Sequence, residues 1–259
     1  MKVKKDWWKN FFNEIYLTTD ARSIFNTSLT QKEVNLLEDL LGLNKNERIL
    51  DLCGGYGRHS LELAKRGYRD LTVLDYSDYQ IKLGQRLAKQ SYLDITFLCR
   101  DARASKLRGG TYSTVFIMAN SFGYFLDDRQ NIRILSEAHR LLQKGGKLLL
   151  DLVDPHYVKK KLKPLSWHEA TKDVIVCRRR HMEGDVIKAR EIVLCKRRGL
   201  LRDGLYCIRI YDKGKIKNLL GRVGFKGISI KKDISLHTRK KDYGFLTSRM
   251  IVTASKAKS

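Results

Sequence analysis

The sequence predicts an α/β fold, a mostly parallel seven-stranded sheet with helices on both faces. Two observations predict it. Between residues 48 and 153, short apolar segments alternate with amphipathic helical patterns, and the connections between them are brief. Such alternation is typical of repeated strand–helix–strand units. After Pro155, three strand-like segments follow one another without helices, which predicts an antiparallel β insertion after the fifth strand.

The first forty residues are expected to be helical. Trp7, Phe11 and Ile15 recur at spacings of four, as on one apolar face of a helix. A second helix, 31–41, has Thr30 as its expected N-cap and Gly42 as its terminator. Residues 1–42 are therefore predicted to form a helical lid.

The sheet is expected to begin at residue 48. Its first five strands are predicted at 48–52, 70–74, 95–99, 112–118 and 147–153, with helices at 58–66, 77–90 and 127–142. The turn Lys144-Gly145-Gly146 separates the last of these helices from the fifth strand. Because these segments are long and agree with one another, they predict one parallel sheet.

The antiparallel insertion is expected to contain strands 173–182, 185–196 and 203–211, with Glu183-Gly184 as a hairpin turn. A helix at 212–223 and strands at 227–235 and 245–253 then complete the main sheet. The predicted organisation is a lid (1–42), a main domain made of 43–155 and 212–259, and an acceptor-side insertion (156–211).

Composition predicts a cytoplasmic globular protein that has no membrane partner. Of 259 residues, 42% are hydrophobic and 31% charged. No apolar run approaches the roughly 20 residues of a membrane helix, and the N-terminus does not resemble a secretory signal. The five cysteines have neither zinc-ligand nor disulfide-framework spacing, so no metal is expected.

The positive charge is distributed unevenly. The chain carries a net charge of +24, of which residues 1–154 contribute +5 and residues 155–259 contribute +19. This asymmetry indicates an acidic partner for the C-terminal part. A solvated basic surface explains the same charge equally well, because the cations are dispersed.

The segment Asp51 to Gly57 joins a predicted strand to a predicted helix and carries the clearest chemistry. Gly55 and Gly57 flank Tyr56, and glycine lets a backbone turn sharply and approach a ligand closely. The N–H groups at the start of the next helix can bind a polar or anionic group. The segment is therefore predicted to hold a ligand at the carboxyl ends of the strands.

Two more carboxylates follow at the ends of successive strands, Asp75 after the second and Asp101 after the third. A carboxylate at the second position can accept hydrogen bonds from both hydroxyls of a ribose, and one at the third from the exocyclic amine of adenine. A dinucleotide fold would require a third glycine where Ser60 stands.

These features resemble the Rossmann-like class I S-adenosylmethionine (SAM)-dependent methyltransferases. The segments Trp7–Phe12, Ser121–Phe125 and Ser248–Val252 are similar to a group whose substrates are small molecules or unassigned. The resemblance implies SAM as cofactor and S-adenosylhomocysteine as product. Cys53, in place of a glycine, and Ser113, in place of an acid, depart from the family pattern.

The resemblance also implies roles for particular residues. Tyr16 would cover the cofactor, Asp51 would orient the turn and the cofactor amino group, and Asn120 would lie beside the sulfonium. The cofactor-binding residues expected in this way are Tyr16, Asp51, Gly54, Gly55, Gly57, Asp75, Tyr76, Asp101, Ala102 and Asn120.

Methyl transfer from a sulfonium is an in-line displacement, so the protein mainly positions the acceptor and excludes water. His156 and Tyr124 are candidate bases, although a single loop histidine is more often a surface or packing residue. The candidate acceptor-binding residues are Ser121, Tyr124, Trp167, Arg209 and Tyr211. The alternatives for the last three are insertion core for the aromatic residues and solvent exposure for the arginine.

The predicted function is methyl transfer to a nitrogen or oxygen of a small molecule, by a monomer or homodimer. The Asn/Asp-Pro-Pro-Tyr/Phe and Pro-Cys motifs of two base-methylating classes are absent. Two alternatives stay open: methylation of RNA or another polyanion through the basic C-terminal part, and SAM binding without turnover.

Overall fold

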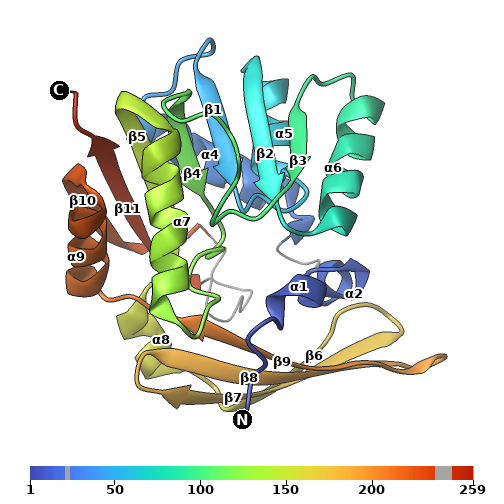
Figure 1. Cartoon of the computed structure of the whole chain (residues 1–259). Coiled ribbons are helices and arrows are strands. Elements are labelled where there is room, and N and C mark those ends of the chain that lie inside the picture. The colour runs from blue at the N-terminus through green and yellow to red at the C-terminus, as the bar shows by residue number, and fades with distance from the viewer. Residues whose placement is uncertain (21–23, 237–246, 259) are drawn as a thin grey trace.

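The computed structural model describes residues 1–20, 24–236 and 247–258. It contains two sheets, and short N-terminal helices lie between them (Figure 1). The larger sheet has seven strands in the order β10-β11-β5-β4-β1-β2-β3. Its strands are β1 (Arg48–Leu52), β2 (Asp70–Asp75), β3 (Thr96–Cys99), β4 (Tyr112–Ile117), β5 (Leu142–Val153), β10 (Phe225–Ile234) and β11 (Arg249–Lys256). The predicted fold class is confirmed.

The strand order creates a crevice at one edge of this sheet. Strands β1 to β5 are parallel to one another, and β11 runs antiparallel to both of its neighbours, β5 and β10. From β1 the chain moves outward to β2 and β3, then returns to the other side of β1 as β4. The order therefore reverses between β1 and β4, where the connecting loops diverge and leave room for a ligand.

Helices cover both faces of the sheet. Apolar side chains of α4 (Thr27–Leu41), α5 (Arg58–Lys65) and α6 (Asp78–Gln90) pack on one face, and those of α7 (Asp128–Leu141) and α9 (Lys213–Val223) on the other. The strands between them carry apolar side chains on both faces, as buried parallel strands require. None of the described helices combines the length and apolar character needed to cross a bilayer.

The second sheet is antiparallel and contains one strand more than the sequence predicted. Its order is β6 (Leu165–Glu169), β7 (Val174–Glu183), β8 (Val186–Cys195) and β9 (Gly199–Arg209). Strand β6 was missed because it is short and largely exposed. A helix, α8 (Pro155–Lys161), was also missed, although Asp154 as N-cap and Pro155 in the first turn are helix-start signals.

The N-terminal helical segment is broken, contrary to the continuous stripe predicted from its apolar residues. Helices α1 (Trp8–Phe11) and α2 (Glu14–Thr19) are separate because Asn13 leaves the helical conformation and caps Ile15. The expected N-cap Thr30 is also wrong, since Asn26 caps α4 at Leu29 and Thr30 lies inside the helix. Gly42 ends α4 in the left-handed conformation, as predicted.

The ends of two sheet strands differ from the prediction. Strand β5 begins at Leu142, and the predicted turn at Gly145 is an irregularity inside it where the pairing with β4 shifts register. The predicted strand 245–253 is found as β11, Arg249–Lys256; its first two predicted residues lie outside the described ones. The division into lid, main domain and insertion remains a prediction.

A buried ion network joins elements that are far apart in the sequence. Arg249 of β11 donates to both oxygens of Asp151 on β5, at 3.1 and 2.7 Å, and to Glu33 of α4 at 2.7 Å. All three side chains are at most 2% exposed. Removing one partner would leave buried charge without compensation.

We expect Arg249→Met to lower the free energy of unfolding by about 3–5 kcal/mol, because Asp151 loses its buried cation. Arg190→Ala is the control, since it removes an exposed arginine that pairs with Asp203; it should cost less than about 1 kcal/mol. Chemical denaturation measures both. Equal losses in the two variants would contradict a stabilising role for the network.

Candidate cofactor cleft

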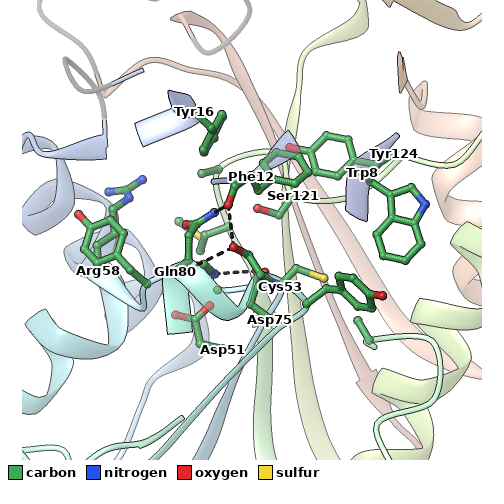
Figure 2. A pocket seen from close by; sticks show the side chains of 18 of the residues that line it. Trp8, Phe12, Tyr16, Asp51, Cys53, Arg58, Asp75, Gln80, Ser121 and Tyr124 are labelled. Carbon is green, nitrogen blue, oxygen red and sulfur yellow. Dashed lines mark hydrogen bonds between the residues drawn. The ribbon is translucent and has the colours of Figure 1, made fainter. Parts of the chain in front are cut away.

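A cleft opens at the carboxyl ends of β1, β2 and β4, at the point where the strand order reverses. Its empty space is about 1,060 Å³, including the part open to solvent. The loops after the strands form its floor, and aromatic side chains of α1, α2 and the loop after β4 form its opposite wall (Figure 2). The sequence predicted this position from the glycine turn.

The turn after β1 brings backbone to the cleft surface. Gly55 has φ of +60°, which favours glycine, and a Cβ there would lie 2.5 Å from Oε1 of Gln80. Cys53, the departure from the family pattern, adopts φ of +60° despite its side chain. Gly54 and Gly55 both line the cleft.

Asp51 places a buried carboxylate beneath this turn. It is fully buried and lines the cleft. Its Oδ2 accepts a hydrogen bond from Ser60, whereas Oδ1 has no partner among the described residues. Burial raises the pKa of Asp51 to about 7. A cationic group in the cleft would both satisfy Oδ1 and stabilise the ionised carboxylate.

Asp75 at the end of β2 connects the turn to α6. Its two oxygens accept hydrogen bonds from the backbone N–H groups of Gly55 and Ser77, each at 2.8 Å. Burial raises its pKa, although these bonds oppose that effect. A carboxylate has about four acceptor sites, so Asp75 keeps capacity for ligand hydroxyls.

Asp101, Ala102 and Tyr76 line one end of the cleft. Arg103 holds Asp101 with bonds of 2.9 Å from Nε to Oδ1 and 2.5 Å from Nη2 to Oδ2. Burial alone would raise the pKa of Asp101, but the hydrogen bonds from Arg103 lower it. Asp101 is therefore an ionised acceptor whose direction is set by Arg103.

Arg58 and His59 line the opposite end, and the sequence analysis did not select them as binding residues. Figure 2 shows Arg58 on the other side of the cleft from Trp8. Glu33 pairs with Arg58, and its carboxylate accepts a hydrogen bond from Nε2 of His59 at 3.0 Å. Burial, then the charge of Arg58, lowers the pKa of His59 to about 4, so the imidazole is neutral. Their position in the sequence, directly after Gly57, was the signal that could have identified them as residues of the cleft.

The wall of the cleft opposite the glycine turn is aromatic. The cleft is lined there by Tyr16, Ser121 and Tyr124, which the sequence analysis selected as site residues. It is also lined by Trp8 and Phe12, which the sequence analysis did not select. Burial is the main cause that raises the pKa of both tyrosines above the usual range of a phenol. They are therefore neutral hydrogen-bonding groups at physiological pH and not bases.

Hydrogen bonds hold the lid over the cleft. Ser77 Oγ and Gln80 Nε2 both donate to the carbonyl of Phe12, at 2.6 and 3.2 Å (Figure 2). Tyr124 packs on the ring of Phe12 with centroids 5.2 Å apart. The segment between α1 and α2 is thus tied directly to the turn that follows β2.

Three other predicted residues lie away from the cleft lining. Gly57 caps α5 and packs on Val73, where a Cβ would approach to 2.8 Å. Asn120 turns its side-chain oxygen to the N–H of Val153 at 3.1 Å and so braces the ends of β4 and β5. His156, predicted as a base, is exposed on α8, where its N–H bonds to the N-cap of that helix.

The insertion residues Trp167, Arg209 and Tyr211 are not part of the lining either, which corrects the expected acceptor pocket. Trp167 is 71% exposed on β6. Arg209 pairs with Asp185 at 2.5 Å, and Tyr211 is buried with its hydroxyl on Asp128 at 2.5 Å.

The physical reason is the position of the lid. Helices α1 and α2 lie between the four-stranded sheet and the larger sheet (Figure 1), and their residues Trp8 and Tyr16 line the cleft. Phe11 packs on Tyr206 of β9 with centroids 5.1 Å apart, and Arg202 of the same strand donates to the carbonyl of Phe11 at 2.8 Å. The inner face of the insertion therefore contacts the lid.

Part of the chain is similar in sequence to known methyltransferases. A family of methyltransferase domains matches residues 49–146. Phosphoethanolamine N-methyltransferase 1 of Triticum aestivum is 24% identical over 149 residues, which are 58% of this chain and 30% of that protein. A tRNA (uracil(54)-C(5))-methyltransferase of Pyrococcus horikoshii is 30% identical over 121 residues, 45% of this chain and 28% of that protein. The chain thus spans less than a third of either relative.

Solved structures share the whole architecture at low identity. A SAM-dependent methyltransferase from Clostridium acetobutylicum superposes with a TM-score of 0.73 at 14% identity, covering 94% of this chain and 96% of that one. CalS10, an amino pentose methyltransferase from Micromonospora echinaspora solved with SAM, gives 0.68 at 15% identity and covers 96% and 99%. Residues 49–146 are therefore similar to methyltransferase domains, and the chain has the fold of these SAM-dependent methyltransferases.

Proposed function

We propose that the protein transfers a methyl group from SAM to a small-molecule nucleophile, with nitrogen favoured over oxygen as the acceptor atom. The observation that carries the proposal is the cleft between the glycine turn and the aromatic lid. It combines three carboxylates at successive strand ends with aromatic side chains that cover the opposite wall. We also infer membership of the small-molecule group that Trp7–Phe12 and Ser121–Phe125 resemble.

SAM is the cofactor, and the described residues suit its parts. Asp51 and Arg58 provide an unpaired carboxylate oxygen and a buried cation for an amino-acid group. Asp75 retains acceptor sites for ribose hydroxyls, and Asp101 faces the end where an adenine amine would lie. When bound, SAM supplies an electrophilic methyl group on a sulfonium.

The aromatic lid favours a small molecule as the methyl acceptor. Phe12, Tyr16 and Tyr124 bound the acceptor side, so an acceptor there is held among aromatic rings and away from water. The two phenols are neutral, and they can orient a lone pair by hydrogen bonds but cannot remove a proton near pH 7. A neutral amine attacks without prior loss of a proton, which is why nitrogen is favoured.

We expect Asp75→Ala to weaken SAM and S-adenosylhomocysteine binding about 10- to 100-fold, because hydrogen bonds to a charged acceptor are lost. Asp78→Ala is the control, since it removes a nearby carboxylate that is 62% exposed. Calorimetric titration measures binding, and thermal unfolding checks the fold. A folded wild-type protein that binds neither ligand would overturn the proposal.

We expect the stability difference between Asp51→Asn and the wild type to depend on pH. In the fold Asp51 keeps its proton up to about pH 7, whereas the unfolded chain loses it near pH 4. Raising the pH through this window therefore destabilises the wild type relative to the variant, by up to about 4 kcal/mol. Denaturation of both proteins from pH 4 to 8 checks this, and a constant difference would contradict it.

RNA is a second candidate acceptor, and two observations favour it. Residues 155–259 carry a net charge of +19, and the relatives include the tRNA methyltransferase named above. Lys159, Lys160 and Lys161 are exposed in the last turn of α8, which follows β5 at the edge of the sheet where the cleft lies. These lysines could contact phosphates near the cleft.

If RNA is bound, its affinity for the protein should fall steeply with salt, because each phosphate contact releases counterions. Replacing Lys159, Lys160 and Lys161 by Gln should make the slope of log K against log salt less negative by about 2 to 3. Lys82→Gln, on α6 and paired with Asp78, is the control. Filter binding of tRNA measures the slope, and salt-independent or absent binding would reject this candidate.

A further inference from the structure

One side chain outside the cleft lining joins four segments that surround its Asp101 end. The guanidinium of Arg103 packs against the rings of Trp8 and Phe125, with its central carbon 4.9 and 4.7 Å from their centroids, and the two rings contact each other with centroids 5.3 Å apart. Its nitrogens also bond to Asp101 and, at 2.9 Å, to Oε1 of Gln130 on α7. Arg103 therefore touches α1, α7, the loop after β3 and the loop after β4.

The groups that Arg103 holds belong to the cleft wall. Trp8, Phe125 and Asp101 all line the cleft, and Tyr76 packs edge-on against Trp8 with centroids 4.6 Å apart. Trp8 is part of the lid, whereas Asp101 belongs to the main sheet. A planar cation that packs on two adjacent rings while its edge binds a carboxylate can hold the rings and the carboxylate in a single geometry.

We propose that Arg103 is a positioning residue that couples the adenine end of the cleft to closure of the N-terminal lid. This inference rests on the proposed function, because it takes SAM as the ligand of the cleft. Arg103 directs the Asp101 carboxylate and at the same time holds Trp8 against the cleft wall. Loss of the clamp loosens Trp8, which keeps its ring contacts with Phe125 and Tyr76. This end of the cleft then opens more readily to solvent, and the ligand dissociates faster.

A simpler role would be to orient Asp101 alone. The two roles differ in how Arg103 and Trp8 depend on one another. If Arg103 acts only on Asp101, the effects of removing Arg103 and Trp8 are independent and multiply. If the clamp is one unit, removing either residue abolishes it, and the double variant is no worse than the more damaged single variant.

The experiment is a double-mutant cycle of Arg103→Gln and Trp8→Leu, with dissociation rates of radiolabelled SAM and S-adenosylhomocysteine as the readout. Each single variant should dissociate about 5- to 30-fold faster, and the double variant at the same rate as the faster single. Arg103→Lys should behave like Arg103→Gln, because lysine lacks the planar fork. Arg129→Gln, which removes an 86% exposed arginine paired with Asp127, should leave the rate unchanged.

Thermal unfolding establishes that each variant is folded, and Trp8→Met, which stays apolar but removes the aromatic ring from the clamp, replaces Trp8→Leu if the latter is not. Multiplying effects, single variants with the wild-type rate, or recovery in Arg103→Lys would overturn the clamp and leave the proposed function intact. A folded wild-type protein that retains neither ligand would instead overturn the proposed function, and the clamp with it.

Discussion

The pairing of buried charges around Glu33 is the interaction on which the arrangement of the cleft depends. Glu33 projects from α4 and meets Arg58 and His59 of α5, while Arg249 reaches it from β11. Burial alone would raise the pKa of Glu33, but Arg58 first, then His59 and Arg249, keep it well below its usual range. The carboxylate is therefore ionised and holds the cations in place.

This network also gives the cleft its chemical polarity. Because Glu33 neutralises Arg58 only in part and Arg249 is shared with Asp151, one end of the cleft is rich in buried charge. The other end is aromatic, with a guanidinium packed on two adjacent rings. A ligand with an amino-acid group at one terminus and a heterocycle at the other matches this distribution. SAM has these two groups at its two ends.

The lid bridges the two sheets of the molecule. On one side Phe12 accepts from Ser77 and Gln80 of the main sheet's loops. On the other, Arg178 of β7 pairs with Asp20 at the end of α2 at 3.0 Å. The four-stranded sheet thus acts as a support for the lid, which explains why its residues are separated from the cleft.

The sequence by itself determined the seven-stranded fold and the floor of the cleft. Strand and helix periods are local, and Asp51, Gly55, Asp75 and Asp101 sit at strand ends where parallel topology must bring them together. The break at Asn13 was not predicted, because a capping residue inside an apolar stripe does not change the periodicity of that stripe. Strand β6 was not predicted, because a short strand whose side chains are largely exposed shows little alternation of apolar and polar residues.

Only the tertiary structure decided the walls of the cleft. Whether Arg58, Trp8 or Trp167 faces a ligand depends on how the lid packs between the two sheets, and no local pattern encodes that contact. Likewise, tertiary packing buries Tyr211 against Phe122 and leaves His156 exposed on α8. The residue types in the sequence identify side chains with suitable chemistry. Which of these side chains face the cleft depends on packing between segments that are far apart in the sequence.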